Sequence, residues 1–197
     1  KVIENGGQVH WARTAEEAYE IVADICREAN AQVVTKGKSM VSEEMHLNSV
    51  LEAAGLKVVE TDLGEYIVQL AGETPSHIIA PAVHKTREQI TELFHEHHSK
   101  LGYTDRVTKR EALVNEARSV LRGTFVTADV GITGANFLVA ETGANVIVTN
   151  EGNGDLTSSL PRVQIVTAGI EKVIPSLDDL SVLLRVLARS ATGQEMS

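Results

Sequence analysis

Residues 31–61, "AQVVTKGKSMVSEEMHLNSVLEAAGLKVVET", carry two runs rich in β-branched residues on either side of a helical pattern. The runs 31–35 and 56–61 predict strands that are covered on both faces. Residues 41–54 between them predict a helix that ends at Gly55. A strand, a helix and a strand in this order are typical of a βαβ unit with parallel strands. The stretch therefore predicts an α/β fold.

The rest of the chain extends this pattern. Capping-box spacing, in which a hydroxyl and a side chain three residues later satisfy the first amides of a helix, predicts four more helix starts at Thr14/Glu17, Thr86/Gln89, Thr108/Glu111 and Ser176/Asp179. Six more β-rich runs predict strands, at 65–70, 76–80, 124–130, 136–141, 145–150 and 163–168. We therefore expect one three-layer α/β domain over residues 1–197, with a helical N-terminal segment at about 10–30. Its sheet should be mostly parallel, with an antiparallel hairpin addition.

The composition excludes several classes of protein. The net charge of −9 and the lack of a basic patch argue against a nucleic-acid surface. The apolar runs are too short to cross a membrane, and nothing near Lys1 resembles a signal peptide, so we expect a cytoplasmic protein. Because the chain begins at Lys1 rather than at methionine, we also expect it to be part of a longer protein. The single cysteine, Cys26, falls in the apolar stripe of a helix, which indicates a buried thiol rather than a cluster ligand.

The segment that follows the first strand carries two lysines and a hydroxyl, Lys36, Lys38 and Ser39. It is not a nucleotide-binding P-loop, because the first glycine of that motif would fall at Gln32. Lysines, a hydroxyl and free amides at a helix start can still bind a carboxylate or a phosphate. In an open α/β sheet, ligands bind beyond the carboxyl ends of the strands, where this segment lies. We therefore predict an anion site there, with a solvated turn as the alternative.

The histidines give one candidate for function and no metal site. In "HEHHS" (95–99), His95 and His98 share a helix face, but the zinc motif H-E-x-x-H would need a histidine at Ser99. A solvated helix end is therefore the preferred interpretation. His84 follows the predicted strand 76–80, where ligands collect, and is a candidate binding residue.

Three glycine turns follow one another in residues 128–154, "ADVGITGANFLVAETGANVIVTNEGNG". Hairpin chemistry alone would explain Gly143 and Asn145. It does not explain why all three turns also carry polar side chains beside small residues. We therefore predict that part of the stretch lines a ligand cleft beside the lysine segment. The binding candidates are Asp129, Thr133, Gly134, Asn136 and Asn150, and Glu141 and Glu151 are the candidate catalytic carboxylates.

Several long motifs carry a resemblance to a known family: "TKGKSMVSEEMHLN", "ETDLGEYIVQLAGETPSHIIAPAVHKTR", "ADVGITGANFLVAETG", "VTNEGNGDL", "LPRVQIVTAGIEKVIPSLDDL" and "RSATGQ". From about residue 8 to 194 the chain resembles the LUD domain of the lactate utilisation protein B family. The resemblance implies a NagB/RpiA/CoA-transferase-like fold. It also implies a ferredoxin-like C-terminal region with two 4Fe–4S clusters, whose cysteines are not in this sequence. We therefore expect the N-terminal part alone, with no cofactor of its own.

The family resemblance also implies a function. It implies that the chain acts with the two other lactate utilisation proteins in oxidising L-lactate to pyruvate, as part of an NAD-independent oxidoreductase complex. On this hypothesis the domain binds a small carboxylate such as L-lactate, or docks its partners. A second hypothesis is a non-catalytic scaffold for the iron–sulfur region. Whether the chain forms a homo-oligomer stays open.

A third hypothesis is a CoA-transferase-like or isomerase-like enzyme. In CoA-transferases of this fold a glutamate near a glycine turn is the nucleophile, and Glu141 or Glu151 would take that role. In sugar isomerases of the fold an aspartate handles protons, but Asn136 stands at that place. An amide is not a general base, so the residues disfavour isomerase chemistry.

Overall fold

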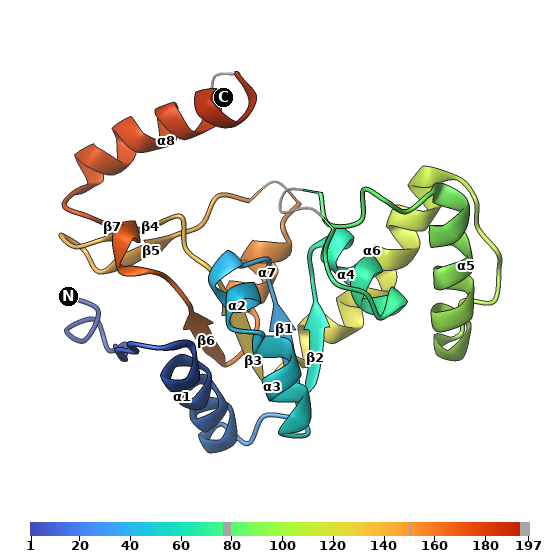
Figure 1. Ribbon diagram of the computed structural model, residues 1–197, viewed down its shortest axis with the longest axis horizontal. Coiled ribbons are helices and arrows are strands. Elements are labelled where there is room, and N and C mark those ends of the chain that lie inside the picture. Colours follow the sequence, from blue (N-terminus) through green and yellow to red (C-terminus); the bar gives the residue numbers. More distant parts are fainter. Residues whose placement is uncertain (77–79, 150, 194–197) are drawn as a thin grey trace.

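The computed structural model has a four-stranded parallel sheet, sheet A, at its centre (Figure 1). Its strands are β1 (Val33–Lys36), β2 (Lys57–Glu60), β3 (Val130–Thr133) and β6 (Val163–Val166). Across the sheet they lie in the order β2-β1-β3-β6. The structure describes residues 1–76, 80–149 and 151–193. The predicted α/β class with a mostly parallel sheet is confirmed.

Three helices cover one face of sheet A: α1 (Ala15–Glu28), α2 (Met40–Glu44) and α3 (Leu47–Ala53). Their buried side chains, among them Cys26 and Leu51, pack against Val34 and Val58 of the sheet. Cys26 has no exposed surface, which confirms the predicted buried thiol, and burial raises its pKa to about 11. The side chains between these helices and the sheet form one of the two hydrophobic cores described here.

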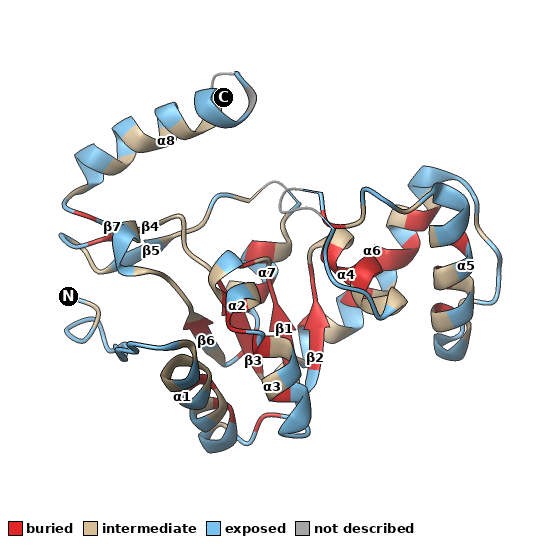
Figure 2. Ribbon diagram, in the orientation of Figure 1, coloured by how far each residue is buried: buried red, intermediate tan, exposed pale blue. Residues whose placement is uncertain are grey.

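The opposite face carries the second core. Because successive side chains of a strand point to opposite faces, Val59 of β2 points away from Val58 and packs with Tyr66, Phe94 and Leu121. These residues come from α4 (Leu63–Ala71), α5 (Arg87–His98) and α6 (Arg110–Thr127), and η1 (Ser99–Leu101) follows α5. The short α7 (Asn153–Ser159) packs on β3. Sheet A is thus the buried middle of three layers (Figure 2).

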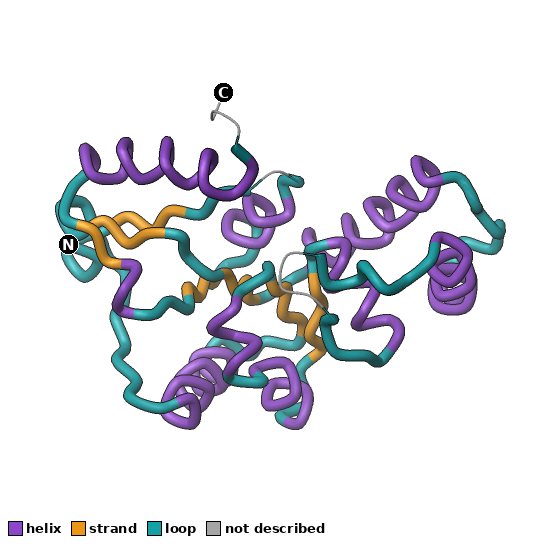
Figure 3. The backbone as a smooth tube through the Cα atoms, turned by 45° about the horizontal axis from the view of Figure 1, so that its top comes forward, coloured by secondary structure: helices purple, strands orange, loops and turns teal. Residues whose placement is uncertain are grey.

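A second, smaller sheet stands beside the first (Figure 3). Sheet B contains β4 (Phe137–Val139), β5 (Ala144–Val146) and β7 (Val173–Ile174), in the order β5-β4-β7. The pair β4–β5 is the predicted antiparallel hairpin, but it belongs to this separate sheet rather than to an edge of sheet A. The short helix η2 (Ile170–Lys172) leads into β7, and α8 (Leu177–Thr192) follows it with much of its surface exposed (Figure 2).

Two predicted strands are wrong because buried helices also contain continuous apolar runs. Residues 65–70 lie in α4, whose start is capped by the Asp62 carboxylate and whose end is the left-handed Gly72. Residues 124–127 are the last turn of α6, and the strand begins only at Val130. The predicted strand 76–80 falls mostly on 77–79, which lie outside the described residues.

Three of the four capping predictions are confirmed. Thr14 and Ser176 cap α1 and α8, and Thr86 forms a full capping box with Gln89 at α5. The fourth is wrong, because α6 begins after Lys109, which makes no side-chain cap bond. The predicted helix 41–54 is split into α2 and α3 at His46, whose φ of 51° is left-handed.

Candidate functional site

The carboxyl ends of β1 and β3 form the point where the chain reverses its direction across sheet A. From β1 the chain crosses to β2 on one side, whereas β3 and β6 lie on the other. Ligands of open α/β sheets bind at such a switch point. Here it holds Lys38 and Ser39 after β1, and Thr133 and Gly134 at the end of β3. The structure therefore brings these four predicted residues to one edge.

Gly134 shows that a glycine at this edge serves close packing within the chain. A Cβ atom at Gly134 would lie 3.2 Å from Oγ of Ser39, tighter than an ordinary contact. Ser39 itself is buried and caps α2 by accepting a hydrogen bond from the Ser42 backbone N–H, at 3.3 Å. Its hydroxyl also lies 3.1 Å from the hydroxyl of Thr167. Ser39, which follows β1, thus packs against Gly134 after β3 and contacts Thr167 after β6.

Thr133 adds an unused polar group to this edge. The residue has no exposed surface, and its Oγ1 is a buried atom without a hydrogen-bond partner among the residues that the structure describes. A buried polar atom usually has a partner, because leaving it without one costs about 1–3 kcal/mol. The Thr133 hydroxyl thus keeps unused hydrogen-bonding capacity at this edge.

Lys36 lies within the protein rather than at its surface. Its side chain is 1% exposed, and its Nζ lies 2.6 Å from Oε1 of Glu43 and 2.9 Å from Oε1 of Glu60. Burial lowers the pKa of Lys36, but attraction by Glu60 and Glu43 outweighs burial, and the pKa is raised. Its charge is therefore already balanced by two carboxylates.

Glu60 completes this buried cluster at the end of β2. Asn48 donates a hydrogen bond to its Oε1 at 2.6 Å, while Oε2 is buried without a partner. Burial raises the pKa of Glu60, and Lys36 and Asn48 only partly oppose the rise. The edge of the sheet therefore holds an acidic group that is harder to ionise than usual.

Glu65 is the functional candidate that the sequence analysis missed. Its side chain is 5% exposed, and its Oε1 lies 3.9 Å from Nζ of Lys38. Burial, and then the charges of Glu60 and Glu43, raise the pKa of Glu65 to about 7. The carboxyl group therefore changes its charge near neutral pH, as a general acid or base does.

One signal in the sequence would have placed Glu65 in a helix. Asp62 followed by Glu65 has the spacing of a helix start before an apolar run. In the structure Asp62 does accept hydrogen bonds from the backbone N–H groups of Gly64 and Glu65, at 3.0 and 3.3 Å. The prediction of a strand at 65–70 hid this signal.

Glu151 belongs to the same edge. The pKa of Glu151 is raised. Burial and the charge of Asp62 outweigh the opposite effects of a hydrogen bond from the backbone N–H of Leu63 and of the charge of Lys38. Of the two candidate catalytic carboxylates, Glu151 is therefore the one that interacts with Lys38. Its neighbour Asn150 lies outside the described residues.

Of the remaining candidates, Asp129 lies away from this edge, and Asn136, Glu141 and His84 make hydrogen bonds to neighbouring segments of the chain. Asp129 lies at the amino end of β3, where its Oδ2 accepts hydrogen bonds from the backbone of Gln32 and Val33, at 2.8 and 3.1 Å. These two bonds, ahead of Arg162, lower its pKa. Asp129 therefore joins the strands at the edge opposite to Lys38.

Asn136 and Glu141 contribute to sheet B and α8. Oδ1 of Asn136 accepts a hydrogen bond from the backbone N–H of Val148 at 2.8 Å. Oε2 of Glu141 accepts one from the backbone N–H of Leu177 at 3.0 Å, at the start of α8. Both side chains thus satisfy backbone donors of neighbouring segments.

His84 lies in the loop between α4 and α5. Its Nε2 lies 2.7 Å from Oε2 of Glu73, and its Nδ1 lies 2.7 Å from Oγ of Ser76. The hydrogen bonds from Lys85 and His84 lower the pKa of Glu73. His84 therefore holds the loop between α4 and α5 together through Glu73 and Ser76.

The solvated helix end predicted for "HEHHS" is wrong for His98. His98 has no exposed surface, and its Nδ1 lies 2.8 Å from Oε1 of Glu116. Its Nε2 lies 2.9 Å from the hydroxyl of Tyr66. With the proton on Nδ1 donated to the carboxylate, Nε2 accepts from Tyr66, and the network is satisfied within the second core.

Comparison with known proteins gives the family. The model of the LUD domain matches residues 1–197. The chain belongs to the LUD domain family. Curated relatives named "Lactate utilization protein B" match it over all 197 residues: 49% identical in Geobacillus sp. (strain WCH70), 51% in Bacillus velezensis and 49% in Bacillus subtilis (strain 168).

This LUD domain spans about two fifths of the length of those relatives, 41%, 40% and 40% respectively. The printed name of these relatives refers to the utilisation of lactate. No solved structure matches the chain.

The described residues contain neither a metal-binding cluster nor a membrane-spanning helix. Within residues 1–76, 80–149 and 151–193, no three histidine, cysteine or acidic side chains are placed to hold a metal ion. In the same part of the chain no helix has the length and apolar character needed to cross a bilayer. The one cysteine, Cys26, is buried in a hydrophobic core, so the residues of this LUD domain do not fit an iron–sulfur cluster.

Proposed function

We propose that this LUD domain is part of a complex that oxidises L-lactate to pyruvate, and that it binds the lactate carboxylate at the carboxyl edge of sheet A. The observation that carries the proposal is the pair formed by Lys38 and Glu65 at the β1/β3 switch point. Their Nζ and Oε1 atoms lie 3.9 Å apart, a separation longer than a hydrogen bond. The Lys38 side chain is a quarter exposed.

The chemistry of a 2-hydroxy acid matches the groups at this edge. The Lys38 ammonium suits the carboxylate, and the unpaired Thr133 hydroxyl and the Glu65 carboxyl suit the 2-hydroxyl. Oxidation of the alcohol releases the hydroxyl proton, which the ionised form of Glu65 accepts. The two electrons and the other proton leave to an acceptor outside this chain, for which the two other lactate utilisation proteins are the proposed partners.

A scaffold that binds no substrate is the second candidate. The cluster of Lys36, Glu43 and Glu60 favours it, because two carboxylates of the chain itself hold the buried Lys36 ammonium. If the domain is only a scaffold, Lys38 and Glu65 do not affect turnover. If the domain binds lactate, they do.

Lactate-dependent reduction of an artificial dye by the whole complex separates the two functions. A charge-assisted hydrogen bond contributes about 1.5–3 kcal/mol, so Lys38→Ala should lower the rate at least tenfold at limiting lactate. Lys57→Ala, at an exposed lysine where β2 begins, should leave the rate unchanged. Equal rates for both variants would establish the scaffold instead.

A further inference from the structure

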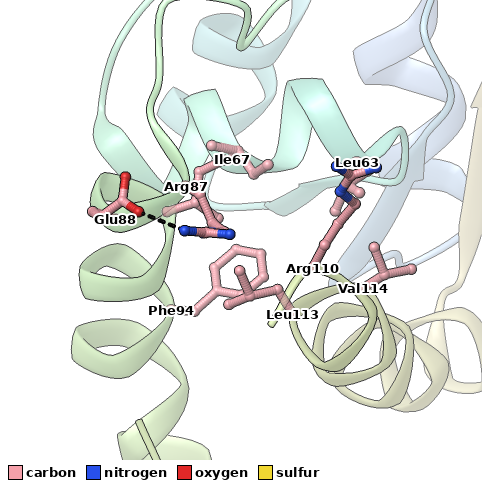
Figure 4. A pocket seen from close by; sticks show the side chains of 9 residues that line it. Leu63, Ile67, Arg87, Glu88, Phe94, Arg110, Leu113 and Val114 are labelled. Carbon is pink, nitrogen blue, oxygen red and sulfur yellow. Dashed lines mark hydrogen bonds and ion pairs between the residues drawn. The ribbon is translucent and has the colours of Figure 1, made fainter. Parts of the chain in front are cut away.

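A pocket of about 390 Å³ opens between α4, α5 and α6 (Figure 4). Its apolar lining comes from Leu63, Ile67, Ile90, Phe94, Leu113 and Val114. Protein interiors rarely contain voids much larger than a water molecule, whereas small-molecule pockets fall at roughly 300–1,000 Å³. The pocket is therefore of ligand size.

Two arginines, Arg87 and Arg110, also line the pocket. Arg87 begins α5 and Arg110 begins α6, and in Figure 4 Arg87 lies beside Phe94 while Arg110 extends toward Leu63. Arg87 is paired with Glu88 at 3.0 Å. Arg110 makes no ion pair with any residue in the described ranges. The two guanidinium groups and the one carboxylate leave the pocket with a single net positive charge.

An adjoining cavity of about 240 Å³ shares Arg87 and Glu88 with the pocket. Thr91 lines this cavity and is only 2% exposed, and its buried hydroxyl has no hydrogen-bond partner in the described part of the chain. Lys109 also lines it and is the N-cap of α6, whose first amides receive no side-chain cap. A buried hydroxyl and helix amides without a side-chain cap are groups that bind an anion.

We propose that this pocket binds a carboxylate that carries an apolar chain, of the class of medium-chain fatty acids. The apolar chain lies among Ile67, Phe94 and Leu113, and the carboxylate lies between Arg87 and Arg110. A single negative charge matches the single net positive charge. The pocket adjoins the edge of sheet A through Leu63, whose backbone N–H is hydrogen-bonded to Glu151, but the proposal does not rest on the function proposed there.

The probe for this proposal is octanoate, titrated into the protein by calorimetry and followed by methyl NMR. We expect saturable binding at one site, with shifts of the methyl groups of Leu63, Ile67 and Leu113. Arg110→Ala should weaken binding about tenfold or more, because it removes a charge-assisted contact. Arg118→Ala is the matched control, since Arg118 is exposed on the same helix and does not line the pocket.

Acetate and octanol separate the two halves of the ligand. Both should bind at least tenfold more weakly than octanoate, because acetate lacks the apolar chain and octanol lacks the charge. Equal affinity for octanoate and either probe would overturn the proposal. So would unchanged affinity in Arg110→Ala, or methyl shifts outside the pocket. Melting temperatures of both variants close to that of the natural protein confirm that they are folded.

Discussion

The carboxylate of Glu65 lies 3.9 Å from the ammonium of Lys38, behind the carboxyl ends of the central strands. The two residues differ in surroundings: the glutamate is almost fully buried, while the lysine is a quarter exposed. Glu65 thus titrates inside the protein, whereas the Lys38 side chain is partly exposed to solvent. This relationship makes the edge of sheet A a candidate for acid–base chemistry on a bound anion.

Glu65→Gln should change how the stability of the protein depends on pH. The pKa of Glu65 is raised from 4.5 to about 7, so the native state holds this proton over a range in which the unfolded chain has lost it. The contribution of Glu65 to stability is therefore complete below about pH 4.5 and is lost as the pH rises to about 7, by about 3 kcal/mol. Glu65→Gln should abolish this loss.

Denaturant unfolding at a series of pH values measures the difference between the two proteins. Glu52→Gln is the control, because Glu52 is an exposed glutamate on α3. Parallel stability curves for the natural protein and Glu65→Gln between about pH 4.5 and 7 would show that Glu65 ionises normally.

Lys36→Met should be strongly destabilising. It leaves Glu60 and Glu43 without the buried ammonium that both contact, and breaking a buried ion pair on one side costs about 3–5 kcal/mol. The double variant Lys36→Met/Glu60→Gln should recover much of this loss, since it also removes the buried charge. Unfolding free energies from denaturant titration give the coupling. If Lys36→Met costs the same with and without Glu60→Gln, the two residues are not coupled and the cluster is not stabilising.

Gly131→Ala should disrupt the packing of α7 on β3. A Cβ atom at Gly131 would lie 1.9 Å from the backbone oxygen of Thr157, which cannot yield as a flexible side chain can. We expect a loss of about 3 kcal/mol or more, at the upper end for overpacked sites. In contrast, Gly123→Ala in α6 meets nothing within 4 Å and should gain about 0.5–1 kcal/mol. Similar melting temperatures for the two variants would refute this close approach.

Glu141→Ala should loosen the start of α8. The carboxylate accepts a hydrogen bond from the backbone N–H of Leu177, and losing a bond of about 1 kcal/mol should speed exchange of that amide roughly fivefold. Hydrogen exchange resolved at the Leu177 amide measures this, with amides in α1 as the internal reference. Unchanged exchange at Leu177 would leave Glu141 without a role in holding α8.

The sequence predicts the βαβ core well because its signals are local. The β-branched runs at 31–35 and 56–61 and the caps at Thr14 and Thr86 each determine their own element. The prediction fails at α4 because this helix is buried on several sides. Its apolar residues therefore form a continuous run, as they would in a buried strand. Local patterns do not contain that information.

The candidate site is predicted in part for the same reason. Topology places Lys38, Ser39 and Thr133 at one edge, because parallel strands share the direction of their ends. The raised pKa of Glu65 depends on burial and on charges from β2 and α2, which only the folded structure brings together. Asp129 was expected at the same edge, but it precedes its strand instead of following it.

Titration of L-lactate into the protein by calorimetry tests the central claim most directly, at about pH 5.5 and about pH 8, on either side of the Glu65 pKa of about 7. The account predicts saturable binding that is tighter at the lower pH, because protonation of Glu65 removes a negative charge beside Lys38. It also predicts at least about tenfold weaker binding in Lys38→Ala and no change in Lys57→Ala. Failure of lactate to bind at either pH, or equal affinity in Lys38→Ala and the natural protein, would contradict it.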